Sequence, residues 1–141
     1  MSKVAVGSGL RVMVVDDDPY IVEIVTRILE SHGHKVTPVN DGKTALFLLP
    51  QVDPEIILLD LGMPGMDGFT ILKELKAKAH WARIPVFMLT GHMDRESVEH
   101  ALRLGAVDYI TKPIDPERLL ARIDRVIKAR VQEAAHRGIS W

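Results

Sequence analysis

The sequence predicts an α/β fold built on a doubly wound parallel sheet. Short runs rich in β-branched and apolar residues alternate five times with stretches of amphipathic helical periodicity. Three of the short runs, at 12–15, 56–59 and 85–89, are almost entirely apolar, which is typical of strands covered by helices on both faces. The connections are short, which favours right-handed crossovers. We therefore expect five βα units, with these three runs as the central strands.

The order of elements follows from the periodicity and the turn residues between the runs. No second core or internal repeat is apparent, so we expect a single domain over residues 10–130. A flexible segment over 1–9 precedes it, and either a helix extension or a linker over 131–141 follows it. The expected strands are 11–15, 35–39, 55–59, 85–89 and 107–110, and the expected helices are 19–31, 42–49, 69–79, 95–104 and 116–135.

The first and last helices have the clearest sequence patterns. Asp18 suits the N-cap of the first helix and Pro19 its first turn. In the last helix the apolar residues recur at helical spacing, and the basic residues between them are expected to face water. Its expected inner stripe is Leu119, Ile123, Val126, Ile127 and Val131, and its expected outer residues are Arg118, Arg122, Arg125 and Lys128.

Composition describes a globular chain with no single strong charge. The 141 residues are 47% hydrophobic and 26% charged, with a formal net charge of -1 at pH 7 and no cysteine. Disulfides and cysteine-ligated metals are thereby excluded, and no apolar run approaches the roughly 20 residues that span a bilayer. The first nine residues lack the features of a secretory signal, so we expect a cytoplasmic protein. The absence of a basic field argues against direct nucleic-acid binding and favours a protein partner.

Two apolar runs end abruptly in aspartate. The first strand runs into Asp16, Asp17 and Asp18, and the third runs into Asp60. Because the ligand site of an open parallel sheet lies outside the carboxyl ends of its strands, we expect these acids to meet in one pocket. A pocket of several carboxylates favours a hard cation.

Two further strand ends add chemistry to the same edge of the sheet. The fourth strand ends at Thr90 and the fifth is followed by Lys112, which place a hydroxyl and an ammonium beside the acids. The loop after Asp60 contains glycines and a proline, and so predicts a tight, exposed turn. Acids, hydroxyl and ammonium are thus expected to share one site.

These residues resemble the receiver domain of two-component response regulators, the family of the chemotaxis protein CheY. The resemblance covers about residues 10–130 and implies the flavodoxin-like strand order 2-1-3-4-5 with five helices. It also implies that the chain is a signalling switch and not an enzyme acting on other substrates. The matching features are the pair Asp16-Asp17, the D-x-x-M-P-x-x-D-G stretch from Asp60 to Gly68, Thr90, Tyr109 and Lys112-Pro113.

The resemblance implies a magnesium site and a phosphoacceptor. Asp60 would be the nucleophile that takes a phosphoryl group from a phosphohistidine. Asp17 and Asp60 would bind Mg²⁺ directly, together with the backbone carbonyl of Gly62, and Asp16 would bind it through water. This set satisfies the preference of magnesium for oxygen ligands.

The resemblance also assigns a relay from the phosphoryl group to a distant face. Lys112 would pair with one phosphoryl oxygen, and the Thr90 hydroxyl would donate to another. Movement of Thr90 would then let Tyr109 turn inward and reshape the face formed by the fourth helix, the fifth strand and the fifth helix. The Lys112-Pro113 bond is expected to be cis on the same ground, although few X-Pro bonds are.

The implied partners are a sensor histidine kinase or a phosphotransfer protein, and a downstream protein or effector domain. A homodimer through the reshaped face is an open alternative. Asp108 and Arg122 match the charged network of such dimers, whereas Val98, Leu104 and Val107 place apolar groups where charges are expected. An apolar patch there would instead favour another partner or another mode of dimerisation.

Two other functions remain open on the sequence alone. One is a pseudo-receiver that works without phosphorylation. The other is a haloacid-dehalogenase-like phosphatase with Asp16 as its nucleophile, although the later acidic motif of that family is missing. Asp18 and Asp67 are interpreted as helix caps. His92 and Gly62 would border the path of the hydrolytic water, which leaves the phosphoryl lifetime open.

Overall fold

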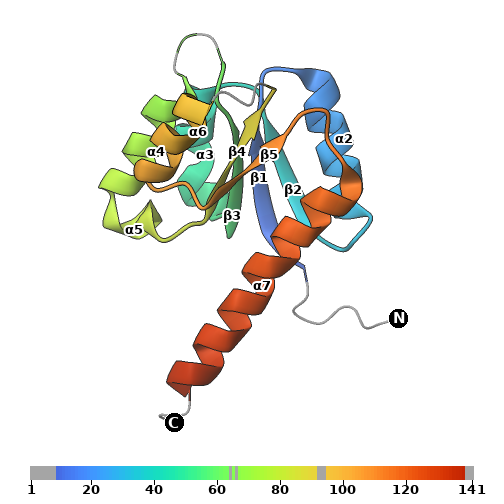
Figure 1. The fold of residues 1–141 in the computed structure, drawn as a ribbon, viewed down its shortest axis with the longest axis vertical. Helices are drawn as coiled ribbons and strands as arrows, with labels where there is room; N and C mark the ends of the chain where they lie inside the picture. Colours follow the sequence, from blue (N-terminus) through green and yellow to red (C-terminus); the bar gives the residue numbers. More distant parts are fainter. Residues whose placement is uncertain (1–8, 64, 66, 92–94, 139–141) are drawn as a thin grey trace.

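The computed structural model describes residues 9–63, 65, 67–91 and 95–138, except the side chains of 130 and 134–138. Within these residues, five strands and six helices alternate along the chain (Figure 1). The strands are β1 (Arg11–Val15), β2 (Lys35–Val39), β3 (Ile56–Asp60), β4 (Val86–Thr90) and β5 (Asp108–Thr111). The helices are α2 (Pro19–Glu30), α3 (Gly42–Val52), α4 (Gly68–Ala77), α5 (Ala79–Ala82), α6 (Arg95–Arg103) and α7 (Pro116–Gly138).

All five strands are parallel and lie in the order β2-β1-β3-β4-β5, which confirms the predicted fold class and strand order. The three runs expected to be central, β1, β3 and β4, are the interior strands, and every residue of β3 and β4 is buried. Lys35 donates to Leu10 and Val39 accepts from Asp16, so these residues face β1. Pro38, one residue before Val39, turns its nitrogen to the open edge, where a missing donor has no cost.

Helices cover both faces of the sheet and divide the core into two layers (Figure 1). Alternate strand residues supply each layer, because side chains in a strand point to opposite faces in turn. Met13 and Val15 pack with α3, α4 and α6, whereas Val12 and Val14 pack with α2 and α7. This division explains why the central strands show no polar alternation.

Several predicted boundaries are corrected by the structure. Strands β3, β4 and β5 each begin and end one residue later than expected, so Asp60 and Thr90 belong to their strands. One helix was missed: Lys78 is extended and ends α4, and the single turn of α5 follows it. A turn of four residues is too short to produce a periodic pattern. The count of six described helices therefore replaces the predicted five.

Helix α7 begins near the carboxyl ends of the strands and extends beyond their amino ends (Figure 1). Leu119, Ile123 and Val126 are buried as expected. Val131 was expected in the inner stripe but is 63% exposed, because the helix has left the sheet at that point. Arg122 was expected to face water but is half-buried and pairs with Asp108.

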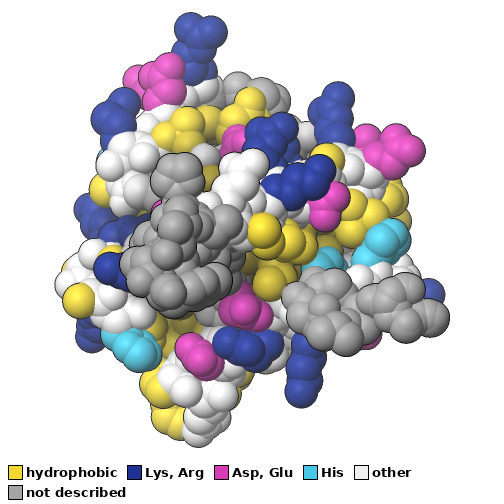
Figure 2. Space-filling model, turned by 90° about the horizontal axis from the view of Figure 1, so that it is seen from below, with side chains coloured by type: hydrophobic (Ala, Val, Ile, Leu, Met, Phe, Trp, Pro, Cys, Tyr) yellow, Lys and Arg dark blue, Asp and Glu magenta, His cyan; other side chains and the backbone are white. Residues whose placement is uncertain are grey.

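Charged side chains are dispersed on the molecular surface. On the face seen in Figure 2, basic and acidic side chains lie among one another and do not gather by sign, in agreement with the formal net charge of -1. Among the described residues, no helix is both long enough and apolar enough to cross a membrane.

His34, directly before β2, is expected to make the stability of the fold depend on pH. His34 Nδ1 accepts a hydrogen bond from the Leu10 amide at 3.1 Å. Burial, and secondarily the nearby His32, lowers the pKa of His34 below its usual 6.5, while Asp124 opposes this. The folded state thus binds protons less readily than the unfolded chain, so stability rises with pH.

We expect the wild type to lose stability as the pH falls through about 6.5, where the unfolded chain begins to take up the proton. His34→Asn keeps an acceptor for Leu10 but does not titrate, so its loss over the same range should be smaller. Urea unfolding at pH 7.5 and 5.5 would measure both slopes, with His80→Asn on an exposed histidine as control. Equal slopes for all three proteins would contradict the assignment.

Candidate functional site

The candidate site lies at the carboxyl ends of the strands, where backbone pairing positions each side chain. Asp16 directly follows β1, while Asp60 and Thr90 are the last residues of β3 and β4. The Asp16 amide donates to the Val39 carbonyl at 3.0 Å, and the Lys112 amide donates to the Thr90 carbonyl at 2.8 Å. The sheet ladder therefore holds the acids, the hydroxyl and the ammonium in register.

Three carboxylates form the centre of the site. One oxygen from each of Asp16, Asp17 and Asp60 lies within 4.8 Å of the others. Asp16 is completely buried and Asp60 is 7% exposed, whereas Asp17 is exposed. Asp16 Oδ1 also accepts the Asp18 amide at 2.9 Å, which orients its carboxylate. The cluster thus has two buried members and one that faces the solvent.

Lys112 bridges the two buried acids. Its Nζ lies 2.9 Å from Asp16 Oδ2 and 3.4 Å from Asp60 Oδ1. Burial alone would lower the pKa of Lys112, but the bond to Asp16 and the charges of Asp60 and Asp16 outweigh it, and the pKa is raised. The ammonium therefore stays charged and offsets part of the repulsion within the cluster.

The ionised form of Asp60 remains unfavourable although Lys112 lies beside it. Burial is the largest cause that raises the pKa of Asp60, and the neighbouring Asp16 adds to it. The Gly62 amide, which donates to Asp60 Oδ1 at 3.2 Å, and Lys112 act in the opposite direction. The net result is a carboxylate that is costly to ionise until another cation reaches it.

The donor set fits a hard divalent cation. The three acids offer only oxygen ligands. Among the described residues, Lys112 is the one cation that pairs with them, and it contacts Asp16 and Asp60 but not Asp17. Oxygen-only sites of this kind suit Mg²⁺ or Ca²⁺ and not the softer transition metals. The cluster of Asp16, Asp17 and Asp60 therefore offers a suitable set of ligand atoms for a divalent cation.

The loop after Asp60 needs glycine at one defined point. A Cβ atom at Gly68 would lie 2.5 Å from the Asp60 carbonyl oxygen, so a larger residue would push the loop away from the strand. Asp67 accepts the Thr70 amide at 2.9 Å and caps α4, which confirms its predicted role. The D-G pair thus returns the chain tightly to the sheet beside the acids.

A hollow of about 420 Å³ opens beside Asp60. A Cβ at Gly91 would lie no closer than 4.0 Å to the Lys112 side chain, so an alanine would be accommodated there and glycine leaves the hollow wider. A phosphoryl-sized group would therefore meet no obstruction from the described residues. Residues that line the hollow are Asp60, Leu61, Gly62, Phe69, Thr90, Gly91, Ser97 and Lys112.

Tyr109 lies away from the acids, beside a charged pair. It is half-buried against the layer that includes Met88. The Arg122 guanidinium lies 5.9 Å from the centre of the tyrosine ring, within cation–π range, and forms an ion pair with Asp108. Arg122 thus reaches from α7 to a ring on the opposite face of the sheet.

Sequence reasoning located the side chains but missed two contacts. The Lys112–Asp16 ion pair and the Gly62 amide bond to Asp60 depend on the distance between segments far apart in the chain or on loop geometry. Asp18 caps α2 by accepting the Tyr20 amide, and the Lys112–Pro113 bond is cis, as predicted. His92 lies outside the described residues.

Comparison with known proteins agrees with this geometry. Residues 12–124 match the model of the response regulator receiver domain. The chain belongs to this family. Receiver domains are signalling modules of two-component systems, so the dehalogenase-like alternative is set aside. The complete burial of Asp16, its supposed nucleophile, also disfavours that alternative.

The relatives include both long and short proteins. The chain is 36% identical over 125 residues to the DNA-binding response regulator MtrA of Mycolicibacterium smegmatis, covering 89% of this chain and 54% of that protein. It is 37% identical over 117 residues to protein PilH of Pseudomonas aeruginosa, covering 83% of this chain and 97% of PilH. The chain thus spans about half the length of MtrA but nearly all of PilH.

A solved structure has the same fold. The chemotaxis protein CheY4 of Vibrio cholerae superimposes with a TM-score of 0.80 at 30% identity, covering 84% of this chain and 99% of CheY4. The receiver domain of NtrX from Brucella abortus superimposes with a TM-score of 0.77 at 33% identity, covering 83% of this chain and 98% of that domain.

The electrostatics of the acid cluster predict that Asp60→Asn stabilises the metal-free protein at pH 7 by about 1 kcal/mol, because the amide carries no charge to bury. A raised folded-state pKa means that the wild type loses stability as the pH rises from about 3.8 through that higher value. Urea unfolding in EDTA across this range would measure the difference. Glu74→Gln, on an exposed carboxylate of α4, is the control. A variant no more stable than wild type would contradict the prediction.

Proposed function

We propose that the chain is a phosphorylation-dependent switch that accepts a phosphoryl group on Asp60. The observation that carries this proposal is the convergence of three carboxylates and Lys112 at one edge of the sheet. Asp60 is the acid that is both nearly buried and open to the hollow described above. A sensor histidine kinase or a phosphotransfer protein would be the donor.

In the proposed reaction an Asp60 carboxylate oxygen attacks the phosphorus of a phosphohistidine. The phosphorus–nitrogen bond breaks, the histidine leaves with its electron pair, and an aspartyl phosphate forms. Lys112 would move from its carboxylate partners to a phosphoryl oxygen, and Thr90 would donate to another. Later hydrolysis of the same bond would return the switch to its starting state, so the catalysis acts on the chain itself.

A divalent cation is part of the proposal. Asp17 and Asp60 would hold Mg²⁺ directly with the carbonyl of Gly62, and Asp16 would bind through water. When bound, the ion would offset the repulsion between the carboxylates and the incoming phosphoryl group. The raised pKa of Asp60 supports this, because burial and the neighbouring Asp16 outweigh the opposing effects of the Gly62 amide and Lys112.

The output would be a change in the surface formed by α6, β5 and α7. Tyr109 contacts the core layer on one side and Arg122 on the other, so a turn of its ring would alter both. Val107 is 51% exposed and Leu102 41% exposed on this surface, which favours a protein partner or a homodimer with an apolar contact. Asp108 and Arg122 pair within the chain, so a dimer that uses them would have to break this pair.

The wider setting is also proposed. Residues 10–130 would form the switching unit, and the remainder of α7 would lead toward an effector domain or stand as a helix extension. We propose a cytoplasmic location and no direct nucleic-acid contact by this segment. A pseudo-receiver that needs no phosphorylation is the second candidate, and labelling separates the two.

Incubation with acetyl phosphate and Mg²⁺ should add one phosphoryl group to the wild type, because the small phosphodonor replaces the kinase. Intact-mass spectrometry would detect the adduct. Asp60→Ala should abolish it, whereas Glu74→Gln should not. A wild type that stays unmodified would favour the pseudo-receiver, and turnover lost only in Asp16→Ala would point back to a phosphatase.

The relay can be tested with fluorotyrosine, because the chain has only two tyrosines. Beryllofluoride with Mg²⁺ should shift the ¹⁹F signal of Tyr109, since a few kcal/mol of differential binding moves a two-state equilibrium almost completely. Tyr20, which is 67% exposed, provides the reference signal and is assigned with Tyr20→Phe. Thr90→Ala should reduce the Tyr109 shift. An unchanged Tyr109 signal in the wild type would refute the relay.

A further inference from the structure

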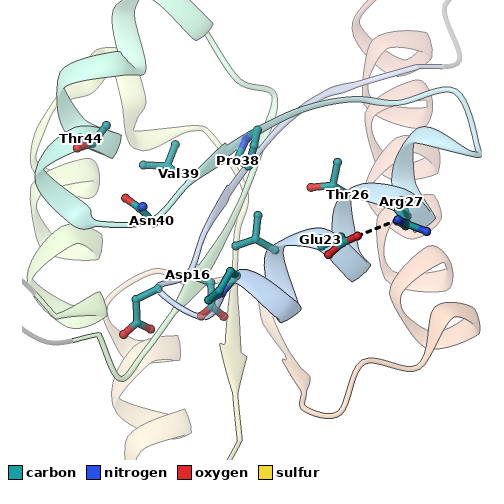
Figure 3. Close-up of a pocket in the computed structure, with 11 residues that line it drawn as sticks. Asp16, Glu23, Thr26, Arg27, Pro38, Val39, Asn40 and Thr44 are labelled. Carbon is teal, nitrogen blue, oxygen red and sulfur yellow. Dashed lines mark hydrogen bonds and ion pairs between the residues drawn. The ribbon is translucent and has the colours of Figure 1, made fainter.

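Two openings lie beside the acid cluster, and they differ in whether they reach Asp60. The larger has a volume of about 780 Å³ and lies between α2 and the segment formed by β2 and the start of α3 (Figure 3). Asp16 and Asp17 line it, but Asp60 does not. Its Glu23 and Arg27 pair with each other at 2.8 Å, as the dashed line in Figure 3 shows. Asp60 lines the smaller hollow, so water would approach an aspartyl phosphate from there.

One side chain does most to limit the width of this smaller hollow. The three groups proposed above to hold the phosphoryl group line it, together with two glycines, which have no side chain. The remaining lining residues are Leu61, Phe69 and Ser97. Phe69 has the largest side chain of these three, and its ring is apolar. Among the described residues, Phe69 is therefore the main barrier to water on its way to Asp60.

The backbone fixes the place of Phe69 relative to Asp60. Phe69 is the second residue of α4, and the residue before it, Gly68, lies against the end of β3. A Cβ at Gly68 would be 2.5 Å from the Asp60 carbonyl oxygen, and the Gly68 amide donates to the Leu61 carbonyl at 3.3 Å. The Phe69 side chain is half-buried and packs on the core layer that includes Met88. The start of α4 thus holds the ring at the wall of the hollow.

The ring of Phe69 also has a partner on another helix. The ring centroids of Phe69 and His100, on α6, are 4.7 Å apart and the two planes are inclined by 54°. This spacing lies within the range of favourable contacts between rings. His100 is half-buried and follows Ser97 by three residues, so the same side of α6 lines the hollow and contacts Phe69. Removal of the imidazole would therefore leave the phenylalanine ring freer to move.

We propose that Phe69, held by His100, limits the access of water to the aspartyl phosphate and thereby sets the lifetime of the phosphorylated state. This inference rests on the proposed function of Asp60. In the hydrolysis, a water oxygen attacks phosphorus, and the bond from phosphorus to Asp60 breaks with its electron pair left on the carboxylate. Phosphate leaves with both protons of the water. Phe69 and His100 form no bond in this step, so they are positioning residues that act by excluding water.

The lifetime of the phosphoryl group tests the role of Phe69. Each protein is phosphorylated with acetyl phosphate and Mg²⁺, the donor is removed, and intact-mass spectrometry follows the loss of the adduct. Phe69→Ala should shorten the lifetime about threefold to tenfold, because water enters the space of the ring. Phe69→Leu fills part of that space and should have a smaller effect. Phe47→Ala is the matched control, because Phe47 is 74% exposed on α3 and should leave the lifetime unchanged.

The role of His100 is tested through its partner. His100→Ala should shorten the lifetime about twofold to threefold, the lower end of what a contact between rings contributes. His100→Phe keeps a ring against Phe69 and should restore the wild-type lifetime. In the double variant of Phe69→Ala with His100→Ala, the second change should have no further effect. Additive losses in the double variant would overturn the pairing of the two residues.

The inference and the proposed function fail in different ways. Urea unfolding first confirms that each variant is folded, and Phe69→Leu carries the test if Phe69→Ala is not. A wild type that takes up no phosphoryl group would overturn the proposed function, and this inference with it. Normal uptake, followed by lifetimes in the folded Phe69 variants that equal or exceed that of the wild type, would overturn the inference alone.

Discussion

The repulsion among three carboxylates at one edge of a parallel sheet is the constraint on which the rest of the structure depends. Oxygens of Asp16, Asp17 and Asp60 are held within 4.8 Å of one another, and two of these acids are buried. Left alone, such a cluster would push the strand ends apart. The backbone hydrogen bonds that join β1, β3 and β4 resist this repulsion. Lys112, directly after β5, offsets part of the negative charge of the cluster.

The incomplete compensation is what makes the site usable. Lys112 contacts Asp16 more closely than Asp60, and the pKa of Asp60 stays raised. A site of this kind gains stability from any cation that binds, and it holds an acid whose charge is not fully neutralised. The same imbalance would favour a metal at Asp17 and would leave Lys112 able to exchange one anion for another. The proposed function would therefore depend on a carboxylate charge that is only partly neutralised, and it needs no unusual reactive group.

The two faces of the sheet are connected at the opposite edge, by β5. Arg122 belongs to α7 on one face, yet its guanidinium contacts Tyr109, whose ring packs on the other. The Asp108–Arg122 pair fixes that reach. Because β5 is an edge strand, a side chain can pass around it, which no interior strand would permit. The position of β5 thus allows Tyr109 to contact a side chain of α7 directly.

Much of this was available from the sequence. The apolar runs that end in Asp60 and Thr90 predicted a parallel sheet. They also predicted that the functional site lies at the carboxyl ends of its strands, because the ligand site of such a sheet lies there. What only the tertiary structure decided are distances and exposures: that Lys112 pairs first with Asp16, that Val131 leaves the core, and that Thr26 has no partner among the described residues. Periodicity records which face a side chain takes within its own element. It carries no information on how far neighbouring elements extend or how closely they approach, and those quantities set the charge balance of the site.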